Sequence, residues 1–121
     1  MSKRHQSDGE MLKGTLDMMI LRTLVARDVH GHIIAKVIER TSEDVLEVEQ
    51  GSLYPALHRL EDRGWVSSYW GASENNRKAK FDRLGAAGRG QLVRATSRWR
   101  QMIRAIGLVM REEATADGGT R

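Results

Sequence analysis

Apolar residues recur at spacings of three and four along much of the chain, which is the pattern of amphipathic α-helices. The first such stretch covers about residues 10–27 and is so rich in apolar side chains that most sides of the predicted helix are apolar. A helix of this kind is buried on more than one face, and in so short a chain we expect a second subunit to cover one of them. After a break at residues 28–31, a second helix is predicted for about residues 32–41.

A third helix is predicted to begin at Gly51-Ser52 and to end at Gly64. Ser52 is a favourable N-cap residue, and Pro55 would then lie in the first turn, where its missing N–H breaks no helical hydrogen bond. Gly64 can adopt the left-handed conformation that ends many helices. The inner side of this helix is apolar, and its outer side carries Tyr54, Pro55, His58, Arg59 and Asp62.

Two segments after the third helix predict a β-hairpin. Residues 65–70 and 77–84 read as strands, and the segment between them, residues 71–76, is polar and contains glycine and asparagine. Such a segment between two short strands is typical of a hairpin turn. The tip and the start of the returning strand are its basic part.

The last predicted helix, at about residues 89–113, has apolar positions with a period of seven. Leu92, Trp99 and Ile106 are seven residues apart, and a second apolar position follows three residues later in each heptad. This pattern is typical of a helix that pairs with another helix, so we expect a homodimer. The expected interface residues are Leu16, Ile20, Leu92, Ala95, Trp99, Met102, Ile103, Ile106, Val109 and Met110.

The order of these elements predicts a mainly α fold. It is that of a winged helix-turn-helix, with three helices and a two-stranded β wing, followed by a long C-terminal dimerisation helix. We expect a flexible N-terminal tail at residues 1–9, a winged helix-turn-helix DNA-binding domain at residues 10–84, the C-terminal dimerisation helix at residues 85–114 and a disordered tail at residues 115–121.

Composition narrows the setting of the protein. The chain has no cysteine, which excludes disulfide bonds and thiolate zinc sites and fits a reducing compartment. No segment of its 121 residues is apolar for long enough to span a bilayer, and no signal peptide is recognisable, so we expect a cytoplasmic protein without a membrane partner. Residues 77–104 contain nine basic residues and one acid, which suits a polyanionic partner or, equally well, a solvated surface.

Double-stranded DNA is the partner that these features favour. The third helix would enter the major groove, where base edges are distinguishable, and the hairpin would contact the phosphate backbone or the minor groove. The expected DNA-contacting residues are Ser52, Tyr54, Pro55, His58, Arg59, Arg77, Lys78 and Lys80. Other interpretations remain open: Tyr54 packed on the hairpin, Arg59 paired with Asp62, and His58 merely exposed.

The segment of residues 51–65, GSLYPALHRLEDRGW, resembles the recognition-helix pattern of the PadR family of transcriptional regulators. Residues 12–21 resemble the family's first helix, and residues 30–35 resemble the start of its second, although His32 stands where a tyrosine is usual. The resemblance implies a cytoplasmic homodimer, usually a repressor on a palindromic operator, with the C-terminal helix in the dimer interface. A single such helix is the mark of the family's short subfamily.

Some members of that subfamily bind flat aromatic drugs between tryptophans. Trp99 lies at the corresponding place, so the resemblance implies a small aromatic effector, whereas packing alone would make Trp99 part of the dimer core. The chain departs from the family pattern at the hairpin exit: Asp82 replaces an aromatic residue, Gly85 a threonine that caps the last helix, and Ala86 a proline. These departures leave open how the last helix enters and how firm the wing is.

Other classes of function fit the sequence less well. We expect no enzyme, no catalytic residue and no cofactor, because paired carboxylates, a phosphate-binding loop and an activated nucleophile are not recognisable. We expect no metal site either, since His30 and His32 flank a glycine without matched further ligands. The remaining alternative is a winged-helix protein-interaction module without DNA readout, and the salt dependence of binding would discriminate between the two.

Overall fold

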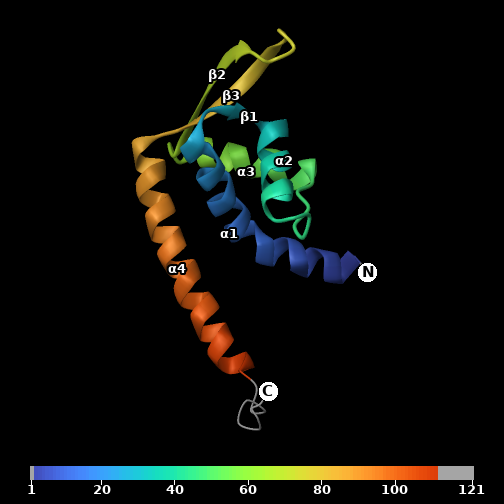
Figure 1. Cartoon of the computed structure of the whole chain (residues 1–121), viewed down its shortest axis with the longest axis vertical. Helices are drawn as coiled ribbons and strands as arrows, with labels where there is room; N and C mark the ends of the chain where they lie inside the picture. Colours follow the sequence, from blue (N-terminus) through green and yellow to red (C-terminus); the bar gives the residue numbers. More distant parts are fainter. Residues whose placement is uncertain (1, 112–121) are drawn as a thin grey trace.

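The computed structural model describes residues 2–111, with side chains from Gly14 onward. In this part of the chain, the elements are α1 (Ser2–Ala26), β1 (Val29–His30), α2 (Gly31–Thr41), α3 (Gln50–Asp62), β2 (Val66–Ala72), β3 (Lys78–Leu84) and α4 (Ala86–Met110) (Figure 1). The predicted order of three helices, a hairpin and a long helix is confirmed. The fold is a mainly helical winged helix-turn-helix with α4 as a long C-terminal helix.

The two outer helices differ from the prediction in their bounds. α1 begins at Ser2, so the expected tail at residues 1–9 is part of a helix from Ser2 onward. Polar residues without proline can continue a helix without an apolar stripe, which is why periodicity placed its start too late. α4 begins at Ala86 and ends at Met110, and the expected disordered tail at residues 115–121 lies outside the described residues.

A short strand, β1, lies within residues 28–31, where the sequence predicted only a break between two helices. Its two residues pair antiparallel with β3, Val29 opposite Asp82 and His30 opposite Phe81, and the sheet order is β1-β3-β2. Two residues carry no detectable periodicity, so only their pairing with a distant strand defines them. β3 is therefore the central strand, and it is paired on both sides at Phe81 and Asp82.

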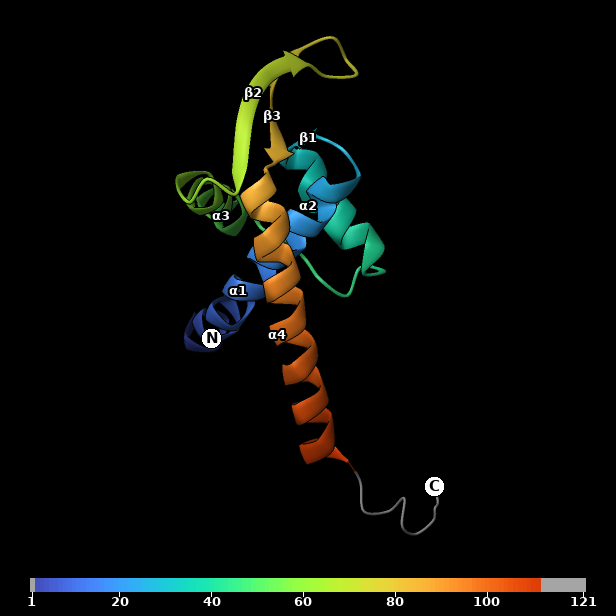
Figure 2. The same ribbon diagram turned by 90° about the vertical axis from the view of Figure 1, so that its left-hand side faces the viewer.

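The predicted hairpin is confirmed, with β2 and β3 paired in register from Val66 opposite Leu84 to Ala72 opposite Lys78. The turn between them is closed by the Ser73 N–H, which donates to the Arg77 carbonyl at 2.8 Å. From the level of β1 onward the hairpin projects beyond the helices as a wing (Figure 2). At the opposite end of the molecule, the C-terminal half of α4 extends past the other elements (Figures 1 and 2).

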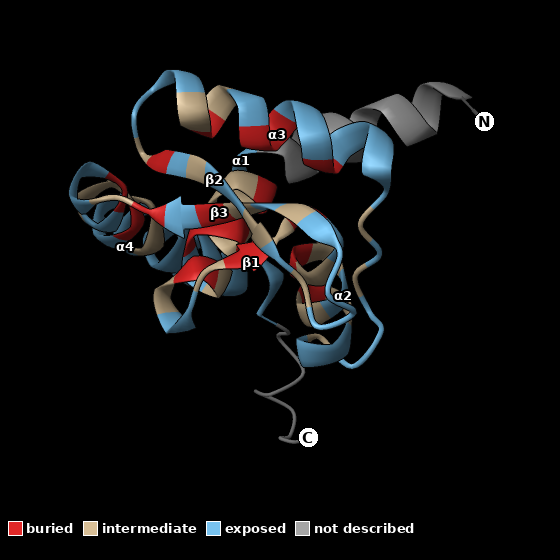
Figure 3. Cartoon of the chain, turned by 90° about the horizontal axis from the view of Figure 1, so that it is seen from above, coloured by how far each residue is buried: buried red, intermediate tan, exposed pale blue. Residues whose placement is uncertain are grey.

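The core lies between α1, α2, α3 and the base of the sheet, where Figure 3 shows the buried positions. α1 contacts α2, α3, α4 and β3, so elements of the same chain already cover much of its apolar surface, whereas Met18, Met19 and Val25 are only partly buried. Three expected dimer residues, Leu16, Ile20 and Leu92, belong to this core and are at most 9% exposed. They are already buried within one chain.

α4 starts directly against the root of the wing. The Gly85 N–H donates to the Trp65 carbonyl at 2.9 Å, and Gly85 occupies the N-cap position of α4 without a side-chain hydrogen bond. A Cβ atom on Gly88 would lie only 2.2 Å from the same Trp65 carbonyl oxygen. Main-chain contacts therefore define the entry of α4 despite the loss of the threonine and proline of the family pattern.

Candidate nucleic-acid interface

The start of α3 differs from the prediction. Glu49 is the N-cap, and its carbonyl accepts hydrogen bonds from the N–H groups of Ser52 and Leu53 at 2.9 Å. Ser52 therefore lies inside the first turn and is not the cap. Pro55 is the sixth residue of the helix, so its missing N–H leaves the Gly51 carbonyl without the usual helical donor. The helix extends one turn further than the capping signal suggested, because Gln50 and Gly51 are exposed and can adopt helical backbone angles.

The end of α3 follows the prediction. Gly64 has a φ of 76°, in the left-handed region, its N–H donates to Glu61, and the Trp65 N–H donates to Leu60 at 3.0 Å. These two hydrogen bonds form a Schellman motif, which turns the chain sharply from α3 into β2. The wing is thereby attached directly to the end of α3.

The outer side of α3 is exposed as predicted. Ser52, Pro55 and His58 are exposed, and the His58 side chain retains 71% of its accessible surface. Tyr54 is 41% exposed, and its ring lies against Gly31, where a Cβ atom would come within 2.8 Å of Tyr54 Cε1. Tyr54 thus packs on the start of α2 and keeps part of its ring on the surface.

Arg59 differs from the other candidate residues of α3. Its guanidinium Nη2 donates to Asp17 Oδ1 of α1 at 2.8 Å, and no such contact with Asp62 is found among the described residues. Because Asp17 and Arg59 are far apart in sequence, no local spacing rule could have suggested the pair. Arg59 holds α3 against α1, with about a third of its side chain still exposed.

The basic side chains of the wing divide into free and paired groups. Arg77 and Lys78 are exposed, and neither has a carboxylate within ion-pair distance in the described part of the chain. The ammonium of Lys78 lies 5.1 Å from the centroid of the Trp70 ring. Lys80 Nζ lies 3.5 Å from Glu61 Oε2 of α3, so it links the wing to the helix.

Asp28, at the end of the α1–β1 connection, fixes the opposite face of the wing. Its Oδ2 accepts hydrogen bonds from the Tyr69 hydroxyl at 2.7 Å and from Arg83 Nε at 3.1 Å, and the Arg83 guanidinium lies 4.7 Å from the Tyr69 ring centroid. The hydrogen bond to Asp28 raises the pKa of both Tyr69 and Arg83. Sequence reasoning missed this triad because its members come from three separate elements.

A second polar cluster joins α3 to both strands of the wing. The Ser68 hydroxyl of β2 contacts Glu61 Oε2 of α3 and lies 3.0 Å from Asp82 Oδ1 of β3. Asp82 is only 4% exposed, and burial raises the pKa of its carboxyl, with a further increase from the negative charge of Glu61 and opposition from the Ser68 hydrogen bond. Although Asp82 replaces an aromatic residue of the family pattern, β3 is paired on both sides at this position. The buried carboxyl shares the single Ser68 hydroxyl with Glu61, so its burial is only partly compensated.

Glu61 and Asp82 of this cluster line an open hollow of about 200 Å³ between α3, the β1–α2 junction and β3. The side chains around it combine carboxylates with basic groups, and they are His30, Gly31, Tyr54, Leu57, His58, Glu61, Ala79, Lys80 and Asp82. Within residues 14–111, no group of three or more histidine or carboxylate side chains is arranged to hold a metal ion.

Replacing Asp82 by asparagine is expected to stabilise the fold near neutral pH. A carboxyl whose pKa is raised by folding stabilises the protein below its unfolded pKa, and this contribution is lost as the pH rises through the folded pKa. The free energy of unfolding of Asp82→Asn should exceed that of the parent chain at pH 7 by on the order of 1 kcal/mol, the scale of one poorly compensated buried polar group. The difference should shrink toward pH 4, and urea denaturation between pH 4 and 8 measures it.

Asp62→Asn is the matched control, because Asp62 is an exposed carboxylate on the same helix that contributes Glu61. Its stability should follow that of the parent chain across the pH range. If the free energy of unfolding of Asp82→Asn has the same pH dependence as that of the parent chain, the buried Asp82 carboxylate does not destabilise the fold at neutral pH.

None of the helices between residues 2 and 111 combines the length and apolar character that crossing a membrane requires.

Comparisons with known proteins identify a family. A model described as the transcriptional regulator PadR-like family matches residues 20–94. The uncharacterized protein X of Lysinibacillus sphaericus is 26% identical over 101 residues, which cover 84% of this chain and 93% of that protein.

Solved structures have the same fold. A transcriptional regulator from Clostridium thermocellum superposes with a TM-score of 0.77 at 24% identity, over 84% of this chain and 99% of that one. A PadR-like transcriptional regulator from Bacillus cereus superposes with a TM-score of 0.74 at 24% identity, over 86% and 99% of the two chains.

The family match covers more than half of the chain and includes α2, α3, both wing strands and the first part of α4. It is a family of transcriptional regulators rather than enzymes, which agrees with the prediction from the sequence. The chain therefore belongs to the PadR-like family of transcriptional regulators.

Proposed function

We propose that the chain is a cytoplasmic, homodimeric repressor that binds a palindromic DNA operator through α3 and the wing. The observation that carries this proposal is the union of two surfaces: the exposed outer side of α3 and the basic wing adjoin one another, with Lys80 of the wing 3.5 Å from Glu61 of α3. A duplex that follows α3 would therefore also meet the wing. The membership of a transcriptional regulator family supports DNA as the partner.

In the proposed complex, α3 lies in the major groove and presents Ser52, Tyr54, Pro55 and His58 to the DNA. Imidazole and phenol groups can hydrogen-bond to base edges, whereas a serine in the first turn of a helix can bind a phosphate together with free N–H groups. Arg59 has part of its donor capacity committed to Asp17, so its main contribution is to hold α3 at its angle to α1. Its remaining N–H groups are available to a phosphate.

The wing supplies contacts that do not depend on sequence. Arg77 and Lys78 are exposed cations without carboxylate partners in the described part of the chain, and each would neutralise a phosphate. Lys80 can join them when a phosphate competes with Glu61 for its ammonium. The base-reading role thus belongs to α3 and the electrostatic role to the wing.

Substitutions on these two surfaces are expected to separate the two roles. His58→Ala should weaken binding to the preferred duplex by about tenfold, which is within the range for losing one hydrogen-bonded contact between a side chain and a base edge. The substitution should also alter the sequences recovered from a random DNA pool. Arg77→Ala should weaken binding to all duplexes alike and reduce the salt slope by about 0.9 for each phosphate that is no longer neutralised. Fluorescence anisotropy titrations at several salt concentrations measure both quantities.

The two variants serve as controls for each other, because both residues are exposed and neither change alters the core. An Arg77→Ala protein with unchanged affinity and slope would show that the wing lies away from the duplex. If the parent chain binds its partner with no salt dependence, the alternative of a protein-interaction module is favoured.

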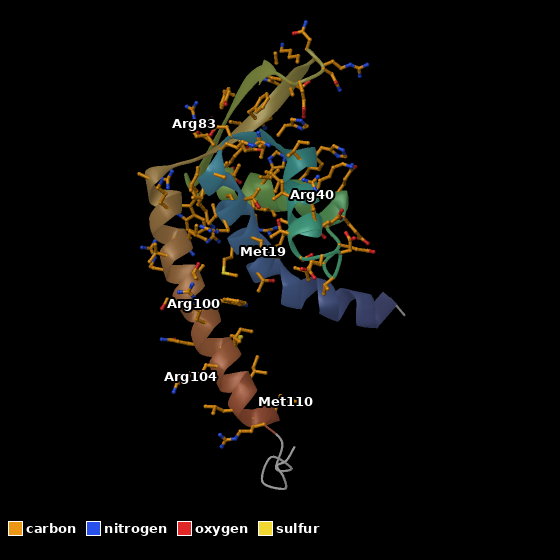
Figure 4. All side chains as sticks on the ribbon, in the orientation of Figure 1. Met19, Arg40, Arg83, Arg100, Arg104 and Met110 are labelled. Atoms are coloured by element: carbon orange, nitrogen blue, oxygen red, sulfur yellow. The ribbon has the colours of Figure 1, made fainter. Side chains whose placement is uncertain are left out.

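The proposed dimer joins through the apolar strip of α4. All residues from Met102 to Met110 are exposed in the single chain, and no other element of the described residues 2–111 lies beside the C-terminal end of the strip (Figures 2 and 4). Two copies related by a twofold axis would present two α3 helices, and operator half-sites for such dimers are typically about 34 Å apart. The strip comprises Ala95, Trp99, Met102, Ile103, Ile106, Val109 and Met110.

The proposal of an aromatic effector rests on Trp99, which is 41% exposed within this strip. α4 carries five arginines and no carboxylate, which favours an anionic planar compound over a cationic one at this site. Saturable quenching by one of the two classes, measured in a variant whose only tryptophan is Trp99, would support an effector site. Quenching by neither would leave Trp99 as dimer core.

A further inference from the structure

The register of the wing places Trp70 on the face that adjoins α3. Residues directly opposite each other in an antiparallel pair share a face of the sheet, as do residues two apart along one strand. Trp70 is opposite Lys80, and Ser68 is opposite Asp82, so these four side chains share one face. Ser68 and Lys80 both contact Glu61 of α3, which shows that this face is turned toward the helix.

Trp70 is also exposed to an unusual degree. It is 63% exposed, and its neighbour Tyr69, on the opposite face, is 37% exposed and is held by Asp28 and by a stacking contact with Phe81. The contact found for the Trp70 ring in the described part of the chain is the ammonium of Lys78, 5.1 Å from its centroid. An indole held in water in this way leaves a large apolar area to be covered by a partner.

The charge around Trp70 restricts what that partner can be. Lys80 lies across from it, Lys78 lies over its ring, and Arg77 follows in the turn. Lys78 and Lys80 thus flank an apolar ring, with Arg77 nearby in the sequence, and this combination complements a surface of alternating sugar and phosphate groups. The deoxyribose rings that line the edge of the minor groove offer that combination, and apolar wing or arm residues can pack there.

We propose that Trp70 is a DNA-contacting residue of the wing, and this inference rests on the proposed function. Its indole packs on the deoxyribose rings at the edge of the minor groove that flanks the site of α3. Lys78 binds the adjacent phosphate while remaining over the ring. The contact adds affinity without reading bases, because every nucleotide presents the same sugar.

Trp70→Ala separates this apolar contact from the electrostatic ones. The substitution removes the indole ring and should weaken DNA binding about tenfold, as for a truncated aromatic anchor. Because it removes no charge, the dependence of the affinity on salt concentration should stay that of the parent chain. Lys78→Ala should instead reduce the slope by about 0.9 per phosphate contact. The probes are the duplex recovered from the random pool and a scrambled duplex of equal length, and both should lose the same factor with Trp70→Ala.

Val45→Ala is the matched control, because Val45 is an 80% exposed apolar residue in the α2–α3 connection, outside the wing. It should leave the affinity unchanged. Trp70→Phe should keep most of the affinity that Trp70→Ala loses. The fluorescence of Trp70 itself is obtained by subtracting the emission spectrum of Trp70→Phe from that of the parent chain, and it should shift to shorter wavelength when duplex is added. Thermal unfolding should be the same for all four variants, since the substituted side chains are exposed.

The outcomes distinguish this inference from the proposed function. If the parent chain binds both duplexes with a steep salt slope and Trp70→Ala binds them equally well, the Trp70 contact is refuted and the proposed function stands. If the parent chain binds no duplex, both fail. A loss confined to the recovered duplex would also overturn the inference, because it would mean that Trp70 reads bases.

Discussion

Replacing Ile106 by aspartate is expected to convert the protein to monomers and to abolish tight operator binding. Only Gly88 and Leu92 of α4 are buried in the single chain, and both lie near its start. Further along, Ile106 is 50% exposed, Val109 81% and Met110 70%. A soluble chain rarely leaves so large an apolar strip uncovered, so a second copy of α4 is expected to cover it.

The size of the effect follows from burying a carboxylate. The two carboxylates that Ile106→Asp introduces at a twofold interface would have no cationic partner within the apolar strip, and each would cost several kcal/mol to desolvate. We expect the dissociation constant of the dimer to rise at least about a thousandfold. Operator affinity should fall by about 10²–10⁴, since the second half-site no longer binds as part of the same molecule.

Sedimentation velocity at micromolar concentration measures the first effect, and anisotropy titration with the palindromic duplex measures the second. Gln101→Asp is the matched control: it introduces the same charge on α4, outside the a and d positions of the heptad, and should leave the dimer intact. Dimers of Ile106→Asp at the same concentration would refute the interface.

Replacing Gly88 by alanine is expected to destabilise the whole fold. The new Cβ would lie 2.2 Å from the Trp65 carbonyl oxygen, 2.8 Å from Leu84 Cδ1 and 3.0 Å from the Trp65 carbonyl carbon. The Trp65 carbonyl is main chain and already accepts the Gly85 N–H, so it cannot move without breaking the junction. α4 must shift away from the wing root instead.

We expect a loss of about 3 kcal/mol in the free energy of unfolding, the upper end of the usual cost of overpacking. This loss outweighs the gain of up to about 1 kcal/mol from exchanging glycine for alanine in a helix. Urea denaturation followed by circular dichroism measures the result.

Gly90→Ala in the same helix is the control. There, a Cβ atom would meet only the flexible end of Arg94, at 3.6 Å, so the helix preference of alanine should stabilise the protein by about 0.5–1 kcal/mol. Equal stability of Gly88→Ala and the parent chain would contradict the close contact at the junction.

Periodicity predicted the elements of the fold because each buries a continuous stripe or face. It also identified the left-handed end of α3 at Gly64, where a single residue type satisfies the turn. It failed at β1, since Val29 and His30 form a strand only through pairing with residues more than fifty positions later. The start of α3 was misplaced because Ser52, a residue common at N-caps, can equally lie within the first turn.

The candidate site divides in the same way. The exposed outer residues of α3 and the free cations of the wing could be predicted, because they depend only on which side of an element they occupy. The bonds of Arg59 to Asp17 and of Ser68 to Glu61 could not. They join elements whose relative placement is decided by the packed core, and the sequence around either partner contains no sign of the other.

The Trp65 carbonyl, placed between the hairpin and α4, has a consequence for how the protein could be controlled. It accepts the Gly85 N–H and stands against Gly88 with no room for one additional carbon atom. These contacts hold α4 at a fixed angle to the wing root. In a dimer joined along α4, a small change in the angle between the two long helices would therefore also rotate each wing and α3, and it would alter the separation of the two α3 helices on the duplex.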